Sequence, residues 1–209
     1  MSASAGILDR ARRNREAAPD KLARIALGPI EDSQLRRAMM ENPRLASALQ
    51  ARLEDGGALA LPQQLPPFSG DTGLAYLLTL PLDKMRFDIG LGWYANALSA
   101  ALIDGRKFTL QIPHDALRRA LALRDAAPSA QIAGTIPETE HAVAEAGRLC
   151  LAAWCGALER AAALITMELD LIDASEIRSA GEEHITVREA RRRFMSDWIN
   201  RAVPKATKR

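Results

Sequence analysis

The sequence predicts an all-α fold: a compact multi-helix domain preceded by a smaller N-terminal helical segment. Apolar residues make up 48% of the 209 residues, which is typical of a folded domain. Aromatic residues are only 4%, and most of the apolar set is alanine and leucine, which favour helices over strands. Apolar residues also recur at three- and four-residue spacing over long stretches.

The N-terminal part predicts three helical stretches. Residues 4–27 are charged and rich in alanine, and Gly28-Pro29 ends this stretch. Asp32 begins a short helix. Asn42-Pro43 begins the next one, with the asparagine as N-cap and the proline in the first helical position. That helix ends at Gly56-Gly57.

A proline-rich stretch then divides the chain. Pro62, Pro66 and Pro67 lie too close together for a helix, so we interpret residues 58–70 as an extended linker. The predicted organisation is an N-terminal helical segment (1–57), this linker, a main helical domain (71–204) and a basic tail (205–209).

The main domain begins with a predicted long helix from Pro81 to Ile103 that tolerates Gly90 and Gly92. Each glycine costs about 1 kcal/mol relative to alanine, but glycines also allow a second helix to pack closely. Residues 107–112 alternate as a strand does, yet they have no partner strand, so we expect an extended connector.

Three further helices are predicted. Pro113 begins the first, and residues 135–138 carry a start signal for the longest apolar pattern, which extends to Ile165. Thr186 and Glu189 match a capping box at the start of the last helix. The apolar stripe of that helix consists of Val187, Ala190, Phe194 and Trp198.

Cysteine content, together with the expected lack of a secretory signal and of a membrane span, favours a cytosolic protein. The net charge of +2 is too small to imply a nucleic-acid or membrane partner. Six acids between residues 167 and 183 are expected to pair with the basic residues that follow position 187. Cys150 and Cys155 point about 140° apart on a helix, which excludes a disulfide within it and favours two buried thiols. No secretory signal or membrane-spanning stretch is expected.

The sequence predicts no catalytic, cofactor or metal site. Histidines 114, 141 and 184 lie far apart and lack the spacing of metal ligands. No phosphate-binding loop or nucleophile motif occurs. Three pairs of acids lie close together in the sequence, but we expect none of them to act in catalysis. The pairs are Asp83 with Asp88, Glu138 with Glu145, and Asp170 with Asp173.

The last helix carries the candidate partner-binding residues. Arginines at positions 191 to 193 can reach phosphates of nucleic acid, but no DNA-binding motif accompanies them, and a solvated or acid-paired face is the alternative. The positions of the aromatic residues on apolar helix faces favour core packing. For Phe194 and Trp198, anchoring of a partner is the other interpretation. The candidate set is Arg191, Arg192, Arg193, Phe194 and Trp198.

Two stretches carry a resemblance to a known family. Residues 92–105 (GWYANALSAALIDG), followed by 115–121 (DALRRAL), resemble the SctK family, the YscK, HrpD and NolU-type accessory proteins of type III secretion. Residues 147–158 (GRLCLAAWCGAL) are similar to a late helix of that family. The resemblance covers about residues 77 to 164.

The resemblance implies a non-enzymatic cytoplasmic adaptor of the sorting platform, a protein-transport role in virulence or symbiosis. Such a protein links the cytoplasmic domain of the inner-membrane ring to the pod protein and is peripheral to the membrane through these partners. It implies no cofactor and no nucleic acid. The alternatives are a small helical ligand-binding protein or enzyme, and a helical nucleic-acid-binding protein.

Overall fold

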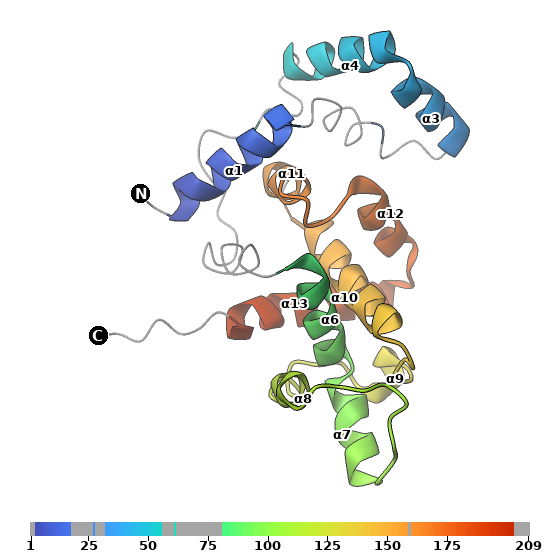
Figure 1. The fold of residues 1–209 in the computed structure, drawn as a ribbon. Helices are drawn as coiled ribbons and strands as arrows, with labels where there is room; N and C mark the ends of the chain where they lie inside the picture. The colour runs from blue at the N-terminus through green and yellow to red at the C-terminus, as the bar shows by residue number, and fades with distance from the viewer. Residues whose placement is uncertain are drawn as a thin grey trace.

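A computed structural model describes residues 3–17, 27, 32–55, 61, 81–158 and 160–202. These residues form eleven α-helices and no strand (Figure 1), which confirms the all-α prediction for the described part of the chain. In the same ranges, no helix combines the length and the apolar character that crossing a membrane requires.

The body is built around α10 (Glu140–Cys155), which packs along α6 (Leu82–Trp93), α12 (Ala174–Glu182) and α13 (Ile185–Ala202). Burial of apolar side chains between these helices is the main source of their stability, since isolated helices of this length are marginal in water. The largest fully buried side chains in these helices are Met85, Ile89, Leu91, Trp93, Leu151, Phe194 and Met195.

Two glycines allow α6 and α10 to approach each other closely. A Cβ added at Gly90 would lie 1.9 Å from the carbonyl oxygen of Val143, and one added at Gly147 would lie 1.8 Å from that of Arg86. The two backbones are therefore in direct contact, each through a glycine. The expectation that a glycine of the predicted 81–103 helix admits a second helix is confirmed for Gly90.

The predicted single helix over 81–103 is wrong in one respect, because it is two helices. The chain leaves helical geometry at Tyr94 (φ −89°, ψ 9°), after which α7 (Ala95–Ile103) begins. Residues 89–95 are all buried. Seven consecutive residues cover every side of a helix, so this part of the chain is surrounded by protein on all sides.

The predicted helix ending at Ile165 is likewise divided. It begins at Glu140, with Thr139 as N-cap rather than residues 135–138, and it ends at Cys155. A turn at Gly156 follows, and α11 (Arg160–Glu168) restarts the pattern.

The predicted capping box at Thr186 is also wrong. Helix α13 begins at Ile185, and the Thr186 amide donates to Nδ1 of His184 (3.3 Å), so the threonine lies inside the first turn. The capping box in the structure opens α12, where the Asp173 side chain accepts from the Glu176 amide and the Glu176 side chain accepts from the Asp173 amide.

Three shorter elements follow α6. Helix α7 packs against α8 (His114–Leu121) and α9 (Ala130–Ala133). The helix predicted to start at Pro113 is confirmed, with Pro113 as its N-cap and His114 as its first helical residue. The stretch 107–112 is a connector without helix or strand, as expected.

The first helix, α1 (Ala3–Ala17), packs against α11 of the body (Figure 1). Its residues Ile7, Leu8 and Ala11 are buried in the common core. The chain beyond α1 forms α3 (Ser33–Glu41) and α4 (Pro43–Asp55), which pack against each other.

The caps of α3 and α4 confirm two sequence predictions. The Asp32 side chain accepts from the amides of Gln34 and Leu35, and the Asn42 side chain accepts from those of Arg44 and Leu45. The predicted domain boundaries stay a prediction. Within the linker 58–70 only Leu61 is described, half-buried against the core, and the tail 205–209 lies outside the described residues.

Candidate protein-binding grooves

A groove lies between the C-terminal part of α10, α12 and the first half of α13. It consists of two adjoining hollows of about 340 and 330 Å³ that share Ala157, Glu189 and Arg192. We call it the arginine groove. Its floor comes from Ala152, Ala153, Trp154, Gly156, Ala157 and Leu158, and its walls from Ile177, Gly181, Arg188, Glu189, Arg192, Arg193 and Ser196.

The floor of the arginine groove is made mainly of small residues. Ala152 and Gly156 are four residues apart, as are Ala153 and Ala157, so each pair of short residues lies one turn apart at this end of α10. Ala152 and Ala153 are buried, whereas Gly156 and Ala157 are exposed at the surface. The floor therefore lies close to the backbone at this end of α10.

The wall formed by α13 carries an excess of positive charge. Arg192 Nη1 lies 2.7 Å from a Glu189 carboxylate oxygen, and Arg188 Nη1 donates to the Gly181 carbonyl (2.6 Å). Arg193 is exposed and forms no ion pair with any residue in the described ranges. Three arginines and one glutamate leave the wall two positive charges in excess.

The structure separates the five predicted partner-binding residues into two groups. Arg192 and Arg193 line the arginine groove. Arg191, Phe194 and Trp198 are only 7%, 1% and 4% exposed, so they offer no surface to a partner. For these three the prediction of a contact surface is corrected, because their side of α13 packs against the core. The competing interpretation of the two aromatic residues as core is confirmed.

Arg191 connects α13 to three other parts of the body. Its guanidinium pairs with Glu183 (2.8 Å), donates to the carbonyl oxygen of Ala146 (3.1 Å) and lies 4.6 Å from the ring centroid of Trp93. The Trp93 ring in turn meets Phe194 edge to face, with centroids 5.9 Å apart. This buried cation is therefore satisfied by a carboxylate, a carbonyl and an aromatic face, all of which offset its loss of hydration.

The acids of residues 167–183 pair mostly outside the basic C-terminal stretch. Only the Arg191–Glu183 pair joins the two blocks among the described ion pairs. Glu168 pairs with Arg15 of α1, and Glu176 pairs with two arginines from α6 and α10. The expected block-to-block pairing is thus wrong for these two acids, because each lies beside a helix that is distant in sequence.

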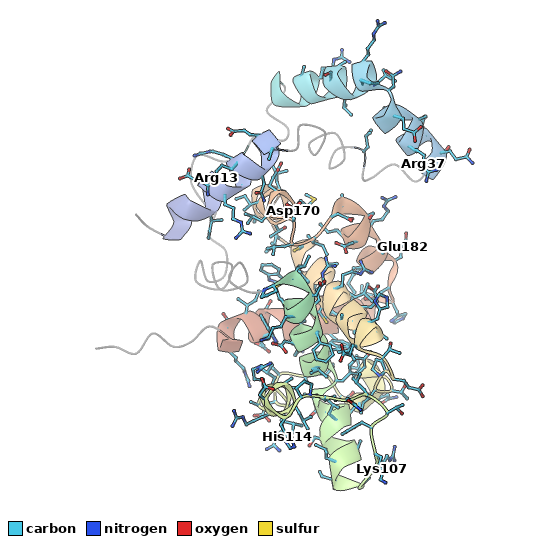
Figure 2. All side chains as sticks on the ribbon, viewed as in Figure 1. Arg13, Arg37, Lys107, His114, Asp170 and Glu182 are labelled. Atoms are coloured by element: carbon cyan, nitrogen blue, oxygen red, sulfur yellow. The ribbon has the colours of Figure 1, made fainter. Side chains whose placement is uncertain are left out.

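A second groove of about 490 Å³ lies at the α7 end of the body. We call it the α7 groove. Figure 2 shows Lys107, on its rim, and Glu182, at the end of α12, at opposite ends of the body. Its apolar lining includes Ala97, Ala100, Ala101, Phe108, Leu110, Ile136 and Pro137, and its charged residues are Asp104, Arg106, Lys107 and Glu138.

The cysteines and histidines that the sequence analysis considered form no reactive or metal-binding cluster within the described residues. Cys150 and Cys155 are free and buried, as predicted, and burial raises the pKa of the first to about 11 and of the second to about 12. His114, His141 and His184 are exposed. In the part of the chain that the structure describes, no three histidine, cysteine or acidic side chains are grouped to hold a metal ion.

Several of the acids considered for catalysis form ion pairs or caps. Asp88 lies 3.1 Å from Arg119, and Glu145 pairs with Arg148 of the same helix. The hydrogen bond from Arg148 lowers the pKa of Glu145 below its ordinary value. Asp173 caps α12. These carboxylates hold helices in place.

Comparisons with protein-family models, curated proteins and solved structures give no match to this chain. The resemblance of residues 92–121 and 147–158 to the SctK family therefore stays a prediction. The described residues add two grooves as candidate binding surfaces.

Proposed function

We propose that this protein is a non-enzymatic cytoplasmic adaptor of a bacterial type III secretion system. It links the cytoplasmic domain of the inner-membrane ring to the pod protein of the sorting platform. The observation that carries this proposal is the presence of two grooves of different chemistry at separate places on one helical body. The resemblance of residues 92–121 and 147–158 to the SctK family supplies the particular system.

An adaptor needs two surfaces that partners occupy at the same time. The arginine groove is built by α10, α12 and α13, whereas the α7 groove is built by α7, the connector after it and the loop after α9. They share no lining residue, and Figure 1 shows α7 and α12 at opposite ends of the body. Partners bound in these grooves do not compete.

The composition of the α7 groove suits a modest protein interface. Apolar side chains form its centre, and charged residues of both signs, among them Asp104 and Arg106 as an ion pair (3.2 Å), surround it. Protein interfaces commonly combine an apolar centre with a polar rim. Ile103, at the end of α7 beside this groove, is 82% exposed and adds apolar surface.

Ionisable groups inside the body support a structural role. Arg191, Glu168 and Glu176 each pair with an oppositely charged group on another element. Buried charges used in this way position helices relative to one another. This use of charge favours a protein that works through its shape and surface.

The proposal is tested by co-purification of the full chain with ring and pod components. Ala100→Arg places a bulky side chain at an exposed position of the α7 groove, and the pair Arg192→Glu with Arg193→Glu reverses charge in the arginine groove. We expect each variant to lose one partner and keep the other. Arg124→Glu, at an exposed position outside both linings, is the matched control and keeps both. A folded wild-type chain that binds neither component overturns the proposal.

A further inference from the structure

We infer that the arginine groove receives an acidic α-helix of a partner protein. The occupant has carboxylates on the side facing α13 and short side chains on the side facing the floor. This inference rests on the proposed function, because it states the chemistry of one of the two partners.

The backbone around the groove favours a helical occupant over an extended one. Floor and walls belong to α10, the turn after it, α12 and α13. The amides and carbonyls of helices bond to one another, so such walls offer no strand edge with which an extended segment pairs. A helix satisfies its own backbone groups and needs only side-chain contacts.

The floor allows such a helix to lie close. Ala153, Gly156 and Ala157 present little side-chain volume toward the groove, so the axis of a second helix can approach α10 at the short end of the usual 8–10 Å range. At the edge of this floor the space narrows, since a Cβ at Gly156 would lie 3.1 Å from Ile177. Short residues on the facing side of the occupant match this shape.

The wall determines the charge of the occupant. Arg188 and Arg192 are four residues apart, so they share one face of α13 and lie about 6 Å apart along its axis. Arg193 points about 100° away from Arg192 and lines the hollow that Trp154 and Leu158 also line. Carboxylates four residues apart on a partner helix are about 6 Å apart along its axis and match this spacing. Arginine binds carboxylate with two parallel hydrogen bonds, which favours an acidic over a merely polar face.

Nucleic acid fits the same arginines less well. Glu189 stands between them on the wall, and Glu182 directly follows Gly181 of the opposite wall. A phosphate backbone laid along the groove would bring its charges against the Glu189 carboxylate. A protein helix can instead place its acids opposite the arginines and its neutral residues opposite this glutamate.

The test uses the full chain and labelled, side-chain-stapled helical peptides of about 18 residues, roughly five turns. One peptide carries glutamates at i, i+4 spacing with alanines on the other face. A second has the same composition with the glutamates spread around the helix, and a third carries lysine in place of glutamate. A DNA duplex and a DNA single strand complete the probes. Binding is measured by fluorescence anisotropy.

We expect the first peptide to bind at least about tenfold more tightly than the second and third, and its affinity to fall as salt is raised. Arg192→Ala with Arg193→Ala weakens this binding about tenfold or more. Ala157→Leu, which fills the floor at an exposed position without changing charge, weakens it as well. The control pair Arg124→Ala with Arg201→Ala, exposed arginines outside the groove, leaves it unchanged.

Equal binding of the first two peptides, or binding that survives both groove variants, overturns the inference. If DNA binds more tightly than the acidic peptide, and replacing Arg192 and Arg193 by alanine abolishes that binding, the inference is overturned in favour of a nucleic-acid-binding surface. Co-purification with ring and pod components is read separately. If co-purification persists while the acidic peptide does not bind, the inferred partner chemistry is wrong and the adaptor function stands. If co-purification is absent while the acidic peptide binds, the adaptor function is wrong and the inferred groove chemistry stands.

Discussion

At the scale of single residues, three consecutive arginines of α13 have three different surroundings. Arg191 is buried against Trp93 and Glu183, Arg192 lies beside Glu189 on the groove wall, and Arg193 is exposed. Successive side chains on a helix differ by about 100°, so neighbours in sequence face different environments. The sequence treats them as one basic cluster; their roles differ because only one faces the core.

We predict that Arg191→Met lowers the free energy of unfolding by about 2–3 kcal/mol, because it removes the ion pair and the cation–π contact and leaves Glu183 partly buried without its partner. Arg192→Met, at a side chain 41% exposed, changes it by less than about 1 kcal/mol. Urea unfolding followed by tryptophan fluorescence measures both. Equal effects of the two substitutions would show that the buried contacts of Arg191 contribute little.

At the scale of elements, the pairing of α6 with α10 depends on glycine rather than on apolar area alone. Gly90 and Gly147 each lie where a Cβ would collide with a carbonyl of the opposite helix. Helical propensity by itself favours alanine at both positions by about 1 kcal/mol. The close contact of the two backbones reverses this preference.

We therefore predict that Gly90→Ala and Gly147→Ala each destabilise the protein by about 3 kcal/mol or more, as overpacking against backbone does. Gly181→Ala is the matched control, since it also lies in a helix but a Cβ there meets nothing within 4 Å. We expect this control to stabilise by up to about 1 kcal/mol. Thermal unfolding of the three variants distinguishes the outcomes, and a neutral Gly90→Ala would contradict the contact.

The starts of α12 and α13 show that local sequence alone does not determine where a helix begins. Asp173 with Glu176 and Thr186 with Glu189 both have the spacing of a capping box, yet only the first pair forms one. At the second, His184 takes the cap position, and Thr186 falls within the helix. The two starts are alike in sequence but differ in structure. A cap stabilises a helix by only about 1 kcal/mol, so packing of the following helix decides which residue comes first.

At the scale of the whole molecule, α1 joins the N-terminal segment to the body. Arg15 lies 2.6 Å from the buried carboxylate of Glu168, and the side-chain amide of Asn14 donates to the Glu168 carbonyl (2.9 Å). Figure 2 shows Asp170, two residues further on, beside α1. The contact joins residues more than 150 positions apart in the chain.

We predict that Arg15→Ala destabilises the docked α1 by about 2–4 kcal/mol, since it leaves the Glu168 carboxylate buried without this arginine. Arg12→Ala, which breaks an exposed pair with Asp9 in the same helix, costs less than about 1 kcal/mol. Limited proteolysis within α1, together with urea unfolding, checks both. If the two variants are cleaved at the same rate, the Arg15–Glu168 pair does not hold α1 on the body.

The candidate site was only partly predictable. Arg192 and Arg193 belong to the basic cluster that the sequence predicts to bind a partner, whereas Arg188 lies outside that cluster and the apolar pattern of residues 152–157 predicts only packing. The α7 groove had no sequence signal beyond an alanine-rich helix. Grooves arise where several helices meet, so their residues are scattered in the chain and share no motif.

By itself the sequence determined that this chain is helical, which stretches are apolar, and that Asp32 and Asn42 start helices, because propensity, periodicity and capping act over a few residues. Only the tertiary structure decided that the chain turns at Tyr94 and Gly156 and that Arg191 lies inside while Arg192 and Arg193 lie outside. These outcomes depend on which face of each helix meets its neighbours, and that face is set by contacts between residues far apart in sequence.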